Sequence, residues 1–77
     1  MKQPKRIVNI KKLLNTKWTA TVPANKEKHF MVTQIIMPNL ATEPIEMITL
    51  EAVHSKRNQL MPWQQLNDAS IWLQGWV

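Results

Sequence analysis

The segment from residue 29 to residue 37, HFMVTQIIM, leaves this chain few ways to fold. It is rich in β-branched and apolar residues and is followed by a proline, which predicts a long β-strand. One face of that strand carries Phe30, Val32 and Ile36, and the other carries Ile35 with two methionines. Because both faces are apolar, the strand is expected to be partly buried on both sides, as in small closed barrels.

Three further segments are rich in strand-forming residues and are separated by turn signals. The first alternates polar and apolar residues, and Pro23 is expected to end it. The last contains Pro62, which lacks an N–H group and therefore predicts an edge strand or a bulge. The three segments are residues 17–22, 45–53 and 60–66.

Two short helical turns complete the pattern. Ile7, Ile10 and Leu14 follow a helical spacing over barely two turns, with Leu13 beside them. Asn9 can cap a single turn over residues 10–14. A second turn is expected to begin in residues 67–70, which have capping and turn chemistry, and to run through residues 71–73.

The order of elements predicts a mainly β fold. It matches a small five-stranded SH3-like or Tudor-like barrel with one short helical turn before the last strand. The alternative is an α+β domain in which residues 63–76 form one helix, because the apolar residues there also follow a helical stripe. In either case residues 10–77 are predicted to form a single domain, preceded by a flexible basic arm over residues 1–9.

Four tryptophans supply much of the core in a chain of only 77 residues. A domain of this size buries only about 60% of the surface of its unfolded chain, so large apolar side chains are needed. In the barrel, Trp72 and Trp76 are expected to fasten the last strand, and Gly75 between them to provide a positive φ angle. The predicted structural residues are Trp63, Trp72, Gly75 and Trp76.

The net charge of +5 is distributed unevenly. Residues 1–28 contain eight of the ten Lys and Arg residues and one acidic residue, whereas residues 29–77 contain two basic and four acidic residues. Such a distribution attracts phosphates or other anionic partners to the surface formed by the first third of the chain.

The sequence shows no feature of a membrane or secreted protein. The basic start is not followed by the apolar segment of a signal peptide, and no run of about 18 apolar residues is present. The chain contains no cysteine, which excludes disulfides and thiolate metal sites. A cytoplasmic protein without a membrane span is therefore expected.

Binding of RNA, or of another anionic macromolecule, is the function that the sequence favours. Single-stranded nucleic acid is held by cations along its backbone and by aromatic rings that stack on its bases. Trp18 follows a lysine and lies near other lysines in the sequence, so it is the candidate aromatic residue. The predicted contact residues are Lys11, Lys12, Lys17, Trp18, Lys26, Lys28 and Arg57.

The alternative is a protein interaction module with a groove lined by Trp63 and Trp72, which could receive an extended peptide. Enzyme activity is not expected, because nothing in the spacing of the serines, histidines and Asp68 indicates a nucleophile turn. His29 and His54 are too few for a closed metal site. No cofactor, metal or small-molecule substrate is predicted.

Several short motifs follow one another along residues 10–77. They are Lys12-Leu13-Leu14, Lys17-Trp18-Thr19-Ala20, Lys26-Glu27-Lys28-His29-Phe30, Leu50-Glu51-Ala52-Val53, Trp63 with Leu66 and Asp68, and Trp72-Leu73-Gln74-Gly75-Trp76. In these motifs the chain resembles a family of small tryptophan-rich bacterial proteins of unknown function. The resemblance implies no reaction or ligand. Gln64 and Leu73 occupy positions where the family commonly has arginine, which argues against an Arg-Trp anion site there.

Overall fold

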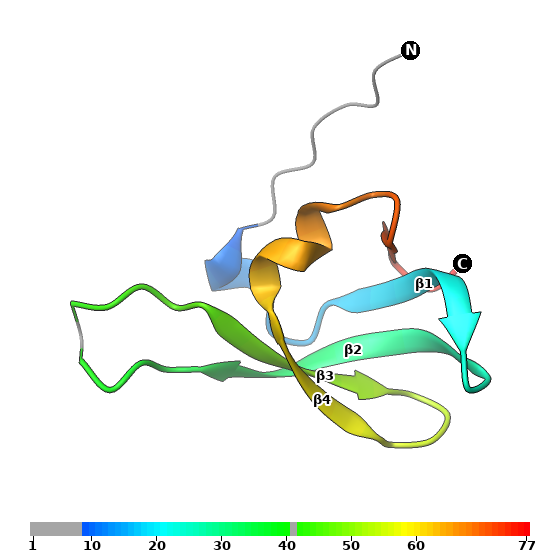
Figure 1. Ribbon diagram of the computed structural model, residues 1–77, viewed down its shortest axis with the longest axis horizontal. Helices are drawn as coiled ribbons and strands as arrows, with labels where there is room; N and C mark the ends of the chain where they lie inside the picture. The colour runs from blue at the N-terminus through cyan, green and yellow to red at the C-terminus, as the bar shows by residue number, and fades with distance from the viewer. Residues whose placement is uncertain (1–8, 41) are drawn as a thin grey trace, which may run out of the picture.

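The computed structural model describes residues 9–40 and 42–77, and it is mainly β, as predicted (Figure 1). Residues 1–8 of the predicted arm lie outside the described residues. Five strands and two 3₁₀ helices follow one another along the chain. The elements are η1 (Ile10–Lys12), β1 (Lys17–Ala24), β2 (Glu27–Ile36), β3 (Met47–Ala52), β4 (Asn58–Pro62), η2 (Trp63–Asn67) and β5 (Trp72–Gln74).

All five strands belong to one antiparallel sheet with the order β4-β3-β2-β1-β5. Within the described residues no ladder joins the edge strands β4 and β5, so the predicted closure into a barrel is not found. The reason lies in the two edges. Strand β5 has only three residues, and β4 ends at Pro62, which has no N–H to donate to a further strand. The edge position expected for Pro62 is confirmed.

The helical turn before the last strand is present, but it begins earlier than predicted. Pro62 has a φ of −64° and precedes η2, so the chain enters the turn at Trp63. The turn predicted to start in residues 67–70 is also present, since the Ile71 and Trp72 N–H groups donate to the Asp68 carbonyl at 3.1 and 3.0 Å. It ends earlier than predicted, because β5 begins at Trp72. The alternative of one helix over residues 63–76 is therefore wrong.

The first strand also differs from the prediction, because β1 continues through Pro23 instead of ending there. The register between β1 and β2 shifts between Thr19 and Ala24. Pro23 lies within this irregular stretch, where it is not required to donate to a regular ladder. Strand β1 is thereby two residues longer than expected and reaches the turn before β2 directly.

The core lies between the sheet and the two 3₁₀ helices, which cross on the same side of it (Figure 1). Leu13, which follows η1, and Leu66 of η2 are fully buried against it. The Asn9 side chain accepts a hydrogen bond from the Lys11 N–H at 3.0 Å, which confirms the predicted cap. The buried apolar residues are Leu13, Trp18, Phe30, Val32, Ile48, Leu50, Ala52, Met61, Leu66 and Trp72.

Hydrogen bonds from the indole N–H groups fix three of the four tryptophans. Trp18 donates to the Thr16 hydroxyl at 2.9 Å, and Trp63 donates to the Ile45 carbonyl at 2.8 Å. Trp76 donates to the Phe30 carbonyl at 2.9 Å. Trp72 is buried edge-on against Phe30, and within the described residues its N–H has no acceptor. Three indoles therefore connect the sheet to neighbouring segments as well as filling space.

The segment after β5 is held against β1, as the sequence suggested. Gly75 has a φ of +82°, and its N–H donates to the Lys17 carbonyl at 2.8 Å. The Thr19 hydroxyl donates to the Gly75 carbonyl at 2.7 Å and accepts from the Val77 N–H at 3.1 Å. Buried Thr19 thus links the strand to the final residues.

Candidate nucleic-acid interface

The turn between β1 and β2 and the turn between β3 and β4 lie at the same end of the sheet (Figure 1). We call this part of the molecule, residues 24–29 and 53–58, the basic end. Consecutive turns of an antiparallel meander alternate between the two ends, which is why segments 30 residues apart meet here. Its basic residues are Lys26, Lys28, His29, His54, Lys56 and Arg57, and its one carboxylate is Glu27.

Both turns place a lysine in the left-handed backbone region. Asn25 and Lys26 have φ angles of 55° and 62° in the two-residue β1–β2 turn, and Lys56 has a φ of 63° in the other turn. A hairpin turn with two positive φ angles strongly prefers Asn-Gly, and the left-handed region costs a residue such as lysine roughly 1–2 kcal/mol. Turn geometry therefore does not explain why lysine occupies position 26.

A surface hollow of about 520 Å³ lies between the two turns. Four of its lining side chains are basic, and no carboxylate lines it. We call it the basic hollow, and its lining residues are Lys26, Lys28, His29, Val53 and His54. A concave surface with several converging cations and no acid is suited to an anion.

An exposed aromatic ring adjoins this hollow. Trp76 is 39% exposed, and the Lys17 Nζ atom lies over its ring, 4.7 Å from the centroid. The His29 ring is tilted against the Trp76 ring at a centroid distance of 6.0 Å. His29 therefore belongs both to the basic hollow and to the surroundings of Trp76, so the two features are continuous.

A buried carboxylate organises the opposite side of the basic end. Glu27 is 4% exposed and accepts hydrogen bonds from Arg57 Nε at 3.0 and 3.1 Å, from Arg57 Nη2, and from the Ser55 hydroxyl. The hydrogen bonds from Arg57, followed by the one from Ser55, hold the pKa of Glu27 below its usual value. This network connects the start of β2 to the β3–β4 turn.

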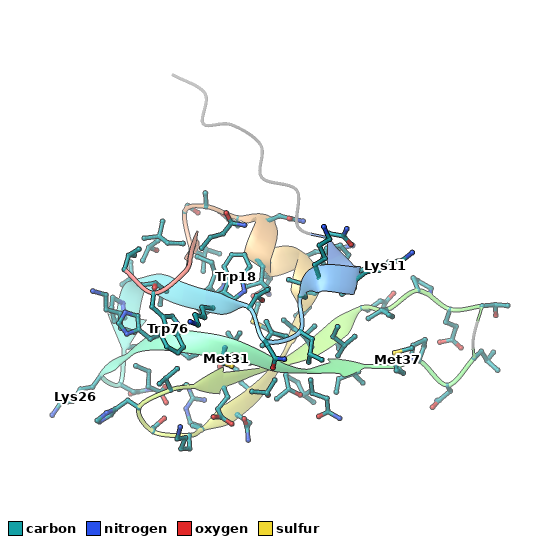
Figure 2. All side chains as sticks on the ribbon, turned by 180° about the vertical axis from the view of Figure 1, so that it is seen from behind. Lys11, Trp18, Lys26, Met31, Met37 and Trp76 are labelled. Carbon is teal, nitrogen blue, oxygen red and sulfur yellow. The ribbon has the colours of Figure 1, made fainter. Side chains whose placement is uncertain are left out.

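The structure separates the predicted contact residues. Lys26 lies at one end of the molecule and Lys11 lies well away from it in η1 (Figure 2), so the predicted residues do not form one continuous patch. Lys26 and Lys28 line the basic hollow, and Lys17 contacts Trp76. Lys12 follows Lys11 in η1, whereas Arg57 is held by Glu27.

Trp18 must be corrected as the candidate stacking residue. It is 2% exposed and belongs to the core, because it alternates with Lys17 on β1 and faces the two 3₁₀ helices (Figure 2). A buried ring offers no face to a base. Trp76, predicted only as a structural residue, is the tryptophan that combines exposure with nearby cations.

Two arrangements of the site were missed from the sequence. Lys17 and Trp76 lie 59 positions apart, and Glu27 and Arg57 lie 30 positions apart, so no local spacing connects them. Strand pairing brings each set together: β1 pairs with β5, and the two turns meet at one end. The sequence did contain one indication of this site, the two lysines within residues 26–28.

Within residues 9–40 and 42–77, no group of three or more His, Cys, Asp or Glu side chains is placed to hold a metal ion. None of the helices in this part of the chain is long and apolar enough to span a bilayer.

No curated protein and no solved structure matches the chain. A family model described as tryptophan-rich protein (DUF2389) matches residues 16–77. The match covers all five strands, the basic end and the four tryptophans, and it leaves residues 1–15, which include η1, outside. The chain therefore belongs to the tryptophan-rich protein family DUF2389.

Proposed function

We propose that the basic end binds single-stranded RNA. The observation that carries the proposal is the continuity of an exposed Trp76 ring with the basic hollow through His29. RNA is recognised mainly as single strands whose unstacked bases lie on aromatic side chains while cations contact the phosphates. The Trp76 ring and the lysines of the basic hollow supply these two components on one surface.

The composition of the site favours weak sequence preference. Phosphate contacts from Lys17, Lys26 and Lys28 position a strand but carry no information about its bases. The Trp76 ring is 39% exposed and has Lys17 Nζ over it; a base stacked there would contribute about 1–3 kcal/mol, whatever its identity. The proposed activity is binding without catalysis.

Fluorescence anisotropy with a labelled single-stranded RNA tests the proposal at two salt concentrations. We expect the affinity to fall steeply with salt, because counterions are released from each neutralised phosphate. The double variant Lys26→Gln/Lys28→Gln should lower the affinity about tenfold or more and reduce the salt slope by about 2, since each lysine contact contributes about one unit.

The matched control is Lys11→Gln/Lys12→Gln, which removes the same charge from η1, away from the basic end. It should change the affinity much less. Equal losses in the two double variants would show that RNA senses only the net charge, and no detectable binding by the wild type would refute the proposal.

A second candidate function is peptide binding at the side of the sheet that stays open between the edge strands β4 and β5, which we call the seam. A groove of about 290 Å³ lies between β1 and the start of β4, and Trp72 lines it as predicted, whereas Trp63 does not. Two exposed apolar residues, Val22 and Ile71, stand at this groove beside Arg57. An extended peptide could add to the free edge of β4 there.

NMR titration separates the two candidates. A protein partner that used the seam would shift the amides of Val22, Gln59 and Ile71, and RNA would shift those of Lys26, Lys28 and Trp76. Partner-induced shifts confined to the basic end would exclude the seam.

A further inference from the structure

We infer that the basic hollow holds a terminal phosphomonoester of the RNA strand, with the neighbouring base on Trp76. This inference rests on the proposed RNA binding and adds the chemical group that the site selects. An internal phosphodiester has one charge and two free oxygens. A phosphomonoester has about −1.5 to −2 charges and three acceptor oxygens at pH 7.

The number of donors favours the monoester. Lys26, Lys28, His29 and His54 all line the same hollow, and the His29 Nε2 atom is already hydrogen-bonded to the Val77 carbonyl oxygen at 3.0 Å. Three basic side chains from two turns, Lys26, Lys28 and His54, therefore surround one volume together with His29. Proteins that bind the phosphodiester backbone of a strand place cations at intervals along a groove. A cluster of donors around one point instead matches a single group with several acceptor oxygens. The cluster thus exceeds what a passing phosphodiester can use.

The charges around the hollow do not cancel the cluster. Glu27 is the nearest carboxylate in the sequence, but it is occupied by Arg57 and Ser55 on the core side of β2. Glu51 of β3 is paired with Lys56 at 4.0 Å. Lysines 26 and 28 have no ion pair within the described residues, so their charges remain available to a ligand.

The orientation of Trp76 places a base beside the phosphate. The Trp76 N–H is fixed on the Phe30 carbonyl, and the neighbouring residue of β2, His29, contacts both the ring and the hollow. A base and its own phosphate are adjacent in a nucleotide, and the ring and the hollow are adjacent here. The first or last nucleotide of a strand can therefore occupy both.

The left-handed Lys26 supports the same conclusion independently. Its φ of 62° occupies a turn position where glycine would be accepted at lower cost, and its side chain lines the hollow. Backbone conformations of this kind are concentrated at binding sites, where a side chain is kept despite its local cost.

The test compares one RNA sequence with a 5′-phosphate, with a 3′-phosphate and with hydroxyl groups at both ends. Anisotropy is measured for the wild type, for Lys28→Gln/His54→Gln and for the control Lys12→Gln. We expect one phosphorylated form to bind at least about tenfold more tightly than the unphosphorylated strand, the gain of one charge-assisted contact. The form that binds more tightly, with a 5′-phosphate or with a 3′-phosphate, identifies which end of the RNA strand occupies the hollow.

The preference should disappear in Lys28→Gln/His54→Gln and persist in Lys12→Gln. If all three strands bind equally well to the wild type, RNA binding stands and the terminal phosphate site is refuted. A preference that survives in Lys28→Gln/His54→Gln refutes the assignment to the hollow. If no strand binds, the proposed function fails together with the inference.

Discussion

Trp18 follows Lys17 in the sequence and Trp76 lies under the Lys17 ammonium group, yet Trp18 is 2% exposed and Trp76 is 39% exposed. Around Trp18 the residues follow their local preferences, with apolar side chains on regular strands. Around Trp76 an aromatic ring is exposed, basic side chains lie close together, and Lys26 and Lys56 occupy left-handed backbone conformations in the two turns. The core is organised for stability, whereas the basic end keeps residues that stability does not require. Departures of this kind are expected where a surface serves binding.

The largest effect should separate the two tryptophans. Trp18→Ala removes a fully buried ring and should lower the free energy of unfolding by about 3–5 kcal/mol. Trp76→Ala removes a half-exposed ring and one hydrogen bond, and should cost only about 1–2 kcal/mol. Urea unfolding followed by circular dichroism measures both. Similar losses would mean that Trp76 is as much a core residue as Trp18.

Glu27→Gln should lower the free energy of unfolding by less than Trp18→Ala does, and the decrease should depend on pH. Because its folded-state pKa lies below the ordinary value of about 4.5, the Glu27 carboxylate stabilises the protein above that pH. The stabilisation is lost as the pH falls through the lower folded-state pKa. The wild type and Glu27→Gln should therefore differ most near pH 7, and the difference should shrink as the pH falls below the ordinary carboxyl pKa and through the lower folded-state pKa.

The control for this comparison is Glu51→Gln, since Glu51 forms only a surface pair with Lys56 at 4.0 Å. It should change stability by less than about 1 kcal/mol. Thermal unfolding at several pH values provides the measurement. A difference between wild type and Glu27→Gln that stays constant from pH 7 to pH 3 would contradict the role of the ionised carboxylate.

Gly75→Ala tests how the segment of Trp76 is attached. A Cβ atom at this position meets nothing within 4 Å, so the cost arises from the backbone alone. At a φ of +82° we expect a loss of about 1 kcal/mol, without a change in the core. Hydrogen exchange of the Gly75 and Val77 amides should accelerate, while that of the Leu50 amide stays slow. Equal acceleration throughout would show that the segment unfolds only with the core.

The smallest effect has the opposite sign. Lys26→Gly converts the β1–β2 turn to Asn-Gly, and should raise the free energy of unfolding by about 0.5 kcal/mol, because relief of the left-handed strain exceeds the added entropy of the unfolded chain. The same change should weaken RNA binding. Chemical denaturation and anisotropy on one protein sample measure both. A variant that is more stable and binds equally well would show that Lys26 has no part in the site.

Much of the fold could be predicted from local patterns. Alternation of side chains identified the strands, Asn9 identified the first cap, and Pro62 identified an edge strand. The prediction of a closed barrel was wrong. Closure depends on whether two edge strands that are distant in the sequence form hydrogen bonds, and the sequence of the three-residue β5 does not contain that information. The choice of Trp18 over Trp76 failed because a nearby lysine in the sequence says nothing about which face of a strand is covered.

The sequence by itself determined the strand order along the chain, the need for tryptophans in a small core and the concentration of lysines in the first third. Only the tertiary structure decided which of those lysines lie on the same part of the surface. Antiparallel pairing brought Lys28 to His54 and Lys17 to Trp76, and it left Lys11 away from the basic end. The physical reason is that charge and hydrophobicity are properties of residues, whereas a binding surface depends on distances that are set by hydrogen bonds between strands remote in the chain.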